Sequence, residues 1–242
     1  MQITLDGFNS TWANDEQHWV TWDLNCIKQY IIDLFDTSDT ILIGRKLAVD
    51  YIPYWQETVT KPDNPMYELA TRIVHAKKVV YTKTLDKSIW DKTELATGKL
   101  SEEINKLKSQ EGKDLIVYGG SSFVSSLIRE GLIDEFHFII NPIAIGKGES
   151  VFGQLNNWQR LRLKNSVTCD SGLVILHYER LWRKSNIAGK SGLCQAVWCV
   201  YLVFVLLINF SKKLKLCTLK PARAQNSISI LTAAVVKNAE VI

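Results

Sequence analysis

The sequence lacks the motifs of several common kinds of site. Its five cysteines include no Cys-x-x-Cys pair and no regular pairing of spacings, which argues against a disulfide framework and indicates a reducing compartment. None of the four histidines has another histidine or a cysteine at a metal-binding spacing, so we predict no metal site. The Gly-x-Gly-x-x-Gly fingerprint of Rossmann folds is also missing, which argues against that type of nucleotide site.

Charge divides the chain into two unlike parts. Residues 1–180 carry 20 Lys and Arg against 24 Asp and Glu, whereas residues 181–242 carry nine against one. An acidic body with a basic end is not one evenly composed domain. We therefore predict a domain over residues 1–180 and a basic tail over residues 181–242. The acidic body argues against nucleic-acid binding.

The tail contains a long stretch without charge. The 21 residues between Lys190 and Lys212 include no charged side chain. The apolar segment 192–210 within this stretch is long enough to cross a bilayer, which needs about 20 residues. Trp and Tyr near one end and lysines at both flanks are typical of a membrane anchor. A non-native extension past a completed domain explains the same composition equally well, and a membrane partner is expected only for the anchor.

The body alternates strand-like and helix-like segments and ends in a strand pair. Short β-prone apolar runs predict strands, and apolar stripes at helical spacing predict helices. The expected strands cover residues 2–5, 40–43, 78–81, 115–118, 135–141, 160–169 and 173–178, and the expected helices cover 24–35, 66–74, 101–109 and a segment after 120. This order predicts an α/β fold whose mostly parallel sheet is covered on both faces and ends in an antiparallel C-terminal hairpin.

The most informative motif is the turn between a strand and a helix over residues 115–122. An apolar run from Leu115 to Tyr118 ends in Gly119 and Gly120, and an amphipathic helix follows. Glycine lacks the Cβ that would keep a phosphate away, and the N-terminal amides and dipole of a helix attract an anion. A simple tight turn is an equally good interpretation of two glycines alone.

Further motifs appear in a fixed order along the body. They are Thr4–Phe8, Ile43–Lys46, Val79–Thr84 and Val117–Gly120, the last followed by residues 131–135 and 142–148. In this order they resemble the dihydrofolate-reductase-like superfamily, and more closely its branch with the C-terminal reductase domain of riboflavin-biosynthesis deaminase/reductases. The resemblance covers essentially the whole body and implies a three-layer α/β/α fold in a stand-alone reductase domain.

The chain departs from this family in four respects. Tyr118 stands where the riboflavin-pathway enzymes usually carry Glu, and no clear Ser/Arg set for a ribose phosphate follows Thr21. The zinc motif of the deaminase domain is missing. The first strand is shorter than in the family, because Met1 falls inside it; this suggests a misplaced start and would cost the sheet part of a central strand.

The resemblance implies a nicotinamide cofactor, usually NADPH. The glycines and two serine amides would hold its diphosphate, and the basic residues would bind the adenosine 2′-phosphate, because a guanidinium matches phosphate oxygens in a fork geometry. A solvated loop is the alternative for Arg45 and Lys46. The residues expected at the cofactor are Gly44, Arg45, Lys46, Thr82, Lys83, Gly119, Gly120, Ser121 and Ser122.

Two carboxylates are candidate catalytic residues. Asp6 follows the first strand, at the sheet edge where α/β folds bind ligands, and either orients the substrate or shapes the turn. Asp23 opens the first helix, where dihydrofolate reductases carry their proton-donor acid, although a charge favoured by the helix dipole is the preferred interpretation. Aromatic residues either line a pocket for a flat heterocycle or pack in the core: Trp12, Trp19, Tyr51, Tyr54 and Trp55.

We therefore expect a cytoplasmic, NADPH-dependent reductase of a small heterocycle, resembling 5-amino-6-(5-phosphoribosylamino)uracil reductase, with water able to supply the proton. The alternative is a catalytically inactive nucleotide-binding domain held at a membrane through residues 192–210. The apolar strands over residues 135–141 and 160–178 can support a homodimer, as this branch of the superfamily often forms.

Overall fold

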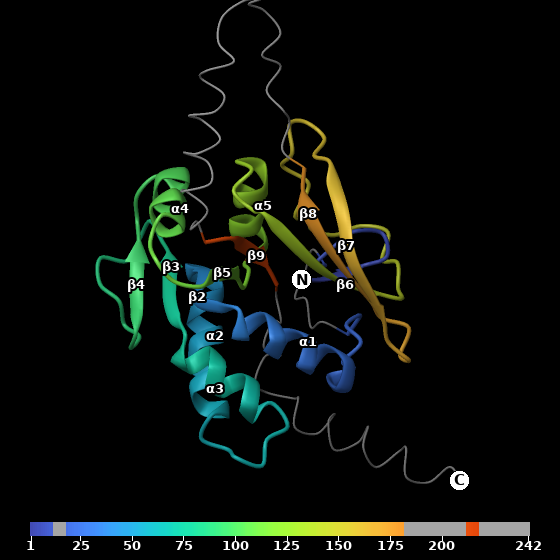
Figure 1. The fold of residues 1–242 in the computed structure, drawn as a ribbon, viewed down its shortest axis with the longest axis horizontal. Helices are drawn as coiled ribbons and strands as arrows, with labels where there is room; N and C mark the ends of the chain where they lie inside the picture. Colours follow the sequence, from blue (N-terminus) through green and yellow to red (C-terminus); the bar gives the residue numbers. More distant parts are fainter. Residues whose placement is uncertain (12–17, 182–211, 218–242) are drawn as a thin grey trace, which may run out of the picture.

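The computed structural model describes residues 1–11, 18–181 and 212–217, which form one mixed sheet with helices on both faces (Figure 1). The strands are β1 (Gln2–Thr4), β2 (Ser38–Gly44), β3 (Lys77–Tyr81), β4 (Thr93–Ala96), β5 (Asp114–Val117), β6 (Glu135–Asn141), β7 (Leu161–Thr168), β8 (Val174–Arg180) and β9 (Leu214–Leu216). The helices are α1 (Leu24–Asp36), α2 (Arg45–Thr58), α3 (Tyr67–His75), α4 (Leu100–Lys108) and α5 (Ser121–Arg129).

The sheet follows the order β4-β3-β2-β5-β9-β6-β8-β7, and β1 pairs with β6. Strands β1 to β6 and β9 pair in parallel, whereas β8 is antiparallel to both β6 and β7. The predicted parallel sheet with an antiparallel C-terminal hairpin is therefore confirmed. Of the segments expected to support a homodimer, β6 lies inside the sheet and β7 forms its end.

Two hydrophobic cores hold the layers together, one on each face of the sheet. Alternate residues of a strand point to opposite faces, so Ile41 and Ile43 of β2 face one core and Leu42 faces the other. The apolar stripes of α1, α2 and α3 pack into the first core, and those of α4 and α5 into the second. The three-layer α/β/α arrangement predicted from the sequence is confirmed.

The expected helices and strands are present, with ends that shift by no more than two residues. Three further elements, helix α2 and strands β4 and β9, were not expected from the sequence. Helix α2 follows Gly44 and contains Pro53, a residue that usually argues against a helix interior. Strand β4 is a short edge strand beside β3.

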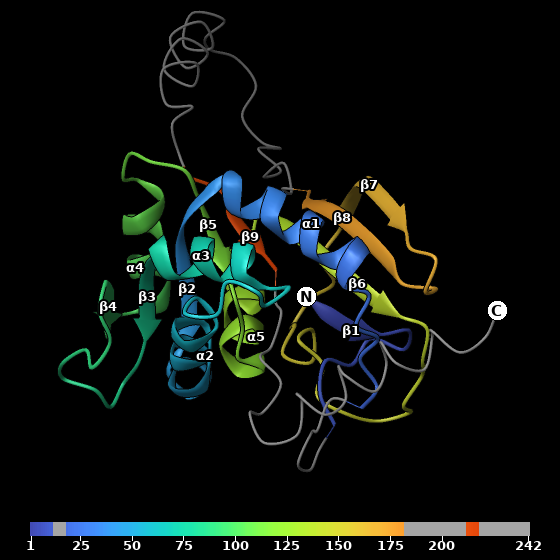
Figure 2. The ribbon, with the colours of Figure 1, turned by 90° about the horizontal axis from the view of Figure 1, so that it is seen from below.

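Strand β9 comes from the part of the chain that the charge pattern assigns to a basic tail. Residues Leu214–Leu216 lie between β5 and β6 and pair in parallel with both (Figures 1 and 2). Lys212 and Lys215 are buried and form ion pairs with Asp39 and Asp114 at 3.1 and 2.9 Å. The described tail residues are thus an integral part of the sheet.

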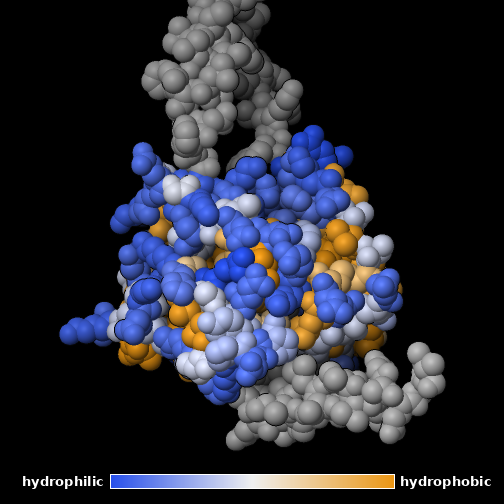
Figure 3. All heavy atoms as spheres, turned by 60° about the horizontal axis from the view of Figure 1, so that its bottom comes forward, coloured by the Kyte–Doolittle hydropathy of each residue, from blue (hydrophilic) through white to orange (hydrophobic). Residues whose placement is uncertain are grey.

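The apolar segment 192–210 lies outside the described residues. In the part of the chain that is described, no helix combines the length and apolar character needed to cross a membrane. On the face drawn in Figure 3, hydrophobic residues form separate small areas within a mainly hydrophilic surface.

Candidate functional site

Most of the residues expected at the site meet at one edge of the sheet. Because β1, β2, β3, β5 and β6 run parallel, their carboxyl ends share this edge. Asp6, Gly44, Thr82 and Gly119 each follow or end one of these strands. In open α/β sheets ligands bind outside the carboxyl ends of the strands. The topology therefore brings the motifs of four separate segments to the place where a ligand is expected.

The two glycine turns contact each other directly. The Gly44 amide donates to the Gly119 carbonyl oxygen at 3.1 Å, which joins the end of β2 to the turn after β5. A Cβ on Gly44 would lie 3.1 Å from Cβ of Phe123 in α5, so glycine permits this close approach. Gly44 therefore positions the turn that precedes α5.

Gly120 begins α5 and leaves open space beside its backbone. Gly119 and Gly120 have φ values of 103° and 29°, in the region that favours glycine. A Cβ on Gly120 would meet no atom within 4 Å. No side chain caps this helix, whose first amides have no partner within the helix itself. Open space facing helix N-terminal amides is the arrangement that accommodates a phosphate.

Two cations begin α2 directly after Gly44. Arg45 is half-buried and Lys46 is exposed, and neither forms an ion pair with any described residue. The first turn of α2 contains no acidic residue. Positive side chains are unfavourable at the positive end of a helix dipole, so helix stability does not explain them. An anion bound at this position would offset both the dipole and the side-chain charges.

Thr82 and Lys83 follow β3 at the same edge. The Thr82 hydroxyl oxygen accepts hydrogen bonds from the amides of Thr84 and Leu85 at 3.1 and 3.2 Å, so it holds the turn after β3. Lys83 is exposed. Ser121 accepts a hydrogen bond from the buried side chain of Asn9 at 2.5 Å, and Ser122 is exposed. Lys83 therefore places an exposed positive charge at this edge, whereas Thr82 stabilises the loop after β3.

Asp6 organises two loops at this edge. Its carboxylate accepts hydrogen bonds from the Thr4 hydroxyl at 2.5 Å and from the amides of Ile145 and Gly146 at 3.0 and 2.7 Å. The Thr4 bond, followed by these amides, lowers the pKa of Asp6. A carboxylate held as an anion is a poor proton donor at neutral pH. The geometry supports the turn-shaping interpretation of Asp6.

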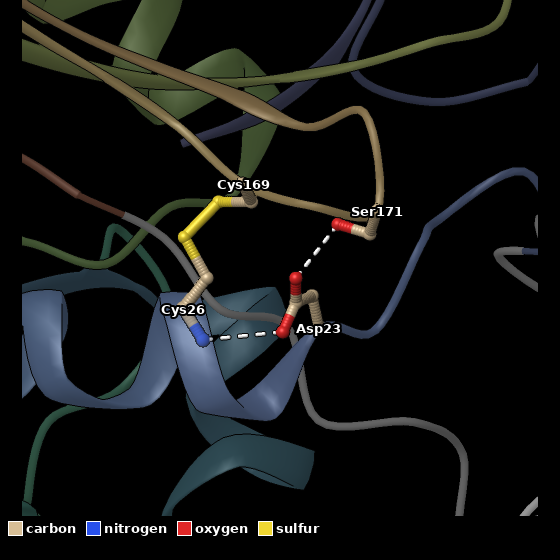
Figure 4. The surroundings of a disulfide bond; sticks show 4 residues. All are labelled: Asp23, Cys26, Cys169 and Ser171. Carbon is tan, nitrogen blue, oxygen red and sulfur yellow. Dashed lines mark hydrogen bonds between the residues drawn. A yellow bond between two sulfur atoms is a disulfide. The ribbon is translucent and has the colours of Figure 1, made fainter.

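Asp23 is the N-cap of α1. It accepts hydrogen bonds from the Cys26 amide at 3.1 Å and from the Ser171 hydroxyl at 2.7 Å (Figure 4). The Ser171 bond is the main cause of its lowered pKa. This arrangement supports the capping interpretation, and within the described residues neither acidic candidate is set up to donate a proton.

A disulfide lies beside Asp23. Cys26 in the first turn of α1 is bonded to Cys169, 143 residues further along the chain and at the end of the β7–β8 hairpin (Figure 4). The cysteine spacing does not indicate this pair, because only tertiary packing brings the two residues together. Closing so long a loop restricts the unfolded chain strongly.

We expect the variant Cys26→Ser to unfold about 2 to 5 kcal/mol more easily than the oxidised wild type, by the loop-closure argument. Urea unfolding with and without dithiothreitol measures the difference. Reduction should lower the free energy of unfolding of the wild type to that of the variant, and it should leave the free energy of unfolding of the variant unchanged. A wild type insensitive to reductant would show that the bond adds nothing.

The aromatic candidates pack in the core rather than around an open site. Tyr51 and Trp55 are fully buried, with ring centroids 6.0 Å apart, and Tyr51 lies 4.7 Å from the ring of Tyr118. Trp19 is buried and Tyr54 is partly buried, whereas Trp12 lies outside the described residues. For Tyr51 and Trp55 the packing interpretation is correct, because α2 carries them into the core under the sheet.

Asn141, which the sequence motifs do not indicate, holds loops together near the candidate site. Fully buried at the end of β6, it accepts a hydrogen bond from the Thr21 amide at 2.7 Å and donates to the Gln2 side chain at 2.8 Å. It thereby fastens the loop before α1 to β1 and β6. A polar residue ending an apolar strand directly before Pro142 is the signal that indicates such a role.

The strand order, the joined glycine turns and the helices on both faces of the sheet define an α/β domain with the dihydrofolate-reductase-like fold. The model of the RibD C-terminal domain matches residues 1–175, and the chain belongs to this family.

Several known proteins resemble the chain. The uncharacterized protein YyaP of Bacillus subtilis is 32% identical over 179 residues, which cover 74% of this chain and 91% of YyaP. A solved putative riboflavin biosynthesis protein from Shewanella sp. PV-4 is similar with a TM-score of 0.58 and 22% identity, covering 75% of this chain and 97% of that protein. A deaminase/reductase from Thermotoga maritima is similar with a TM-score of 0.53 and 17% identity, covering 74% and 55%. These two structures share the fold.

Proposed function

We propose that the protein is an NADPH-dependent reductase of a small pyrimidine-type heterocycle. The observation that carries the proposal is the pair of glycine turns, in which Gly44 contacts Gly119 and open space faces the start of α5 at Gly120. Two cations, Arg45 and Lys46, begin the neighbouring helix α2 and form no ion pair with any described residue. This set matches a dinucleotide with a diphosphate and a further phosphate.

Different residues bind different parts of the cofactor. The backbone at Gly119 and Gly120 and the first amides of α5 hold the diphosphate, because no Cβ blocks the approach. Arg45 and Lys46 bind the 2′-phosphate that distinguishes NADPH from NADH. Bound NADPH supplies the hydride, and the protein orients the reactants and excludes water around them. Since Asp6 and Asp23 are held as anions, water supplies the proton.

The substrate assignment rests on family membership. The Thermotoga maritima relative is described as a 5-amino-6-(5-phosphoribosylamino)uracil reductase, and we propose a related pyrimidine for this chain. Tyr118 replaces the usual Glu before the glycines and is buried against Tyr51, so this position contributes packing rather than a carboxylate. We propose a cytoplasmic location, where the cellular reductants would reduce the disulfide between Cys26 and Cys169 described above.

The variant Arg45→Ala tests the phosphate assignment. Loss of a charged hydrogen bond to phosphate, worth about 1.5 to 3 kcal/mol, should weaken NADPH binding roughly 10- to 100-fold and leave NADH binding nearly unchanged. Titration of the full chain, followed by tryptophan fluorescence, measures both affinities. Lys106→Ala, which removes an exposed cation from the last turn of α4, is the matched control and should change neither.

An equal loss of affinity for NADPH and for NADH in Arg45→Ala would contradict a role for Arg45 at the 2′-phosphate. NADPH oxidation in the presence of the pyrimidine then tests turnover. Tight NADPH binding without oxidation of any pyrimidine would select the alternative of an inactive nucleotide-binding domain.

A further inference from the structure

A cluster of three metal-ligating side chains lies at the opposite edge of the sheet from the glycine turns. Glu135 and His137 stand two residues apart at the start of β6, on the same face, and His177 of β8 is the direct cross-strand partner of His137. The His177 Nε2 atom is 3.2 Å from Glu135 Oε2, and the His137 Nε2 atom is 3.8 Å from the same oxygen. All three ligand atoms lie within 4.8 Å of one another.

The buried histidine has an unsatisfied nitrogen that points into this cluster. His137 is 3% exposed, and its Nε2 atom is buried with no hydrogen-bond partner among the described residues. A buried polar atom without a partner is costly, so its presence calls for a ligand.

The outer contacts have the arrangement that orients metal ligands. The Tyr30 hydroxyl of α1 lies 2.7 Å from Nδ1 of His137. With Nε2 bound to a cation, Nδ1 carries the proton and donates to the Tyr30 oxygen, the usual outer-shell bond of a ligating histidine. Lys213, directly before β9, holds the other carboxylate oxygen, Oε1 of Glu135, at 3.0 Å, which leaves Oε2 turned toward the histidines.

We propose that Glu135, His137 and His177 bind a divalent transition-metal ion of the zinc class. Zinc bonds of about 2.0 to 2.1 Å in a tetrahedron place neighbouring ligand atoms roughly 3.3 Å apart, close to the distances seen here. Two imidazoles and a carboxylate are a common zinc ligand set with a fourth position open to water. His177 and Glu135 are partly exposed, which provides an entry path.

The ion would join four elements that are far apart in the sequence. Its ligands come from β6 and β8, and the residues that orient them come from α1 and from the position directly before β9. Cross-strand pairing explains why the histidine spacing along the sequence does not indicate the site. Because the site lies at the opposite sheet edge from the glycine turns, we expect zinc binding to leave cofactor binding unchanged.

The test is a zinc titration of the full chain after metal removal with a chelator. We expect one equivalent to bind and to raise the unfolding temperature of the wild type by several degrees. His177→Ala and Glu135→Gln should each weaken binding at least tenfold while keeping the wild-type circular dichroism spectrum and NADPH affinity. His75→Ala removes a histidine from the exposed end of α3 and should bind zinc like the wild type.

A second group, Asp23 with Cys26 and Cys169, can also offer ligands and must be separated from this site. Cobalt(II) in place of zinc should give a spectrum without a thiolate charge-transfer band, and Cys26→Ser should keep the full stoichiometry. Absence of binding to the wild type, or unchanged affinity in both His177→Ala and Glu135→Gln, would overturn the proposal.

Discussion

The variant Gly120→Val should lose NADPH binding while the protein stays folded. Gly120 has a φ of 29° and begins α5, and the direction in which a Cβ would project is empty. Two valine methyl groups would occupy the space that we assign to the diphosphate, and they would shield the first amides of the helix. We expect affinity to fall at least 100-fold, measured by the fluorescence titration used for Arg45→Ala.

Backbone strain alone must be separated from this steric effect. A side chain at positive φ costs about 1 to 3 kcal/mol of stability wherever it occurs. Gly172 has a φ of 84° in the β7–β8 turn, and a Cβ there would make only ordinary contact with Pro142 at 3.5 Å. Gly172→Val therefore has comparable strain and should bind NADPH normally. A folded Gly120→Val variant with wild-type affinity would refute the diphosphate assignment.

Removing the side chains of β9 should cause the largest loss of stability. Leu214 and Leu216 are completely buried in the core that α4 and α5 cover. Truncating a buried leucine costs about 2 to 5 kcal/mol, and a whole domain has a free energy of unfolding of only about 5 to 15 kcal/mol. The double variant Leu214→Ala/Leu216→Ala should therefore be mostly or wholly unfolded at 37 °C.

The backbone of β9 adds to this expectation. This segment lies between β5 and β6, and its backbone is hydrogen-bonded on both sides. Cys217 N donates to Val117 O at 3.1 Å beside β5, and Asp134 N donates to Leu214 O at 3.0 Å beside β6. A chain that ends at residue 181 would leave two strand edges open, and we expect it to be less stable still. Urea unfolding of the full chain, the double variant and the shortened chain measures these losses.

Lys213→Ala is the control for side-chain changes on this strand. Its side chain is exposed, and its ion pair with Glu135 should contribute no more than about 1 kcal/mol. If the double leucine variant were as stable as Lys213→Ala, β9 would not be a structural strand in solution.

Much of the fold is predictable from local pattern. The strands of the body are apolar runs bounded by turn residues, and helices α1, α3, α4 and α5 have clear apolar stripes. The order of the short motifs also indicates the family and the edge where the glycines meet. Local signals of this kind need no knowledge of which segments lie side by side.

The unexpected features depend on tertiary contacts. Helix α2 contains Pro53, which argues against a helix in the sequence. Its buried aromatic side chains could not be assigned to the core in advance, because they are covered only when α1 and α3 pack against the same face of the sheet. Lys212 and Lys215 give the segment around β9 the composition of a basic tail. Their acidic partners Asp39 and Asp114 are more than 90 residues away in the sequence, so the local charge pattern does not show the ion pairs. The pair of His137 and His177 could not be predicted for the same reason, because the two residues become neighbours only when β6 and β8 pair.

The position of β9 also bears on how the protein is made. Strands β5 and β6 are synthesised roughly 100 and 70 residues, respectively, before the segment that separates them in the sheet. Until that segment leaves the ribosome, both strands present unpaired edges, which are templates for association with other chains. Pairing over such a sequence distance also raises the contact order and slows folding. The nascent chain should therefore depend on chaperones until its last quarter has been translated.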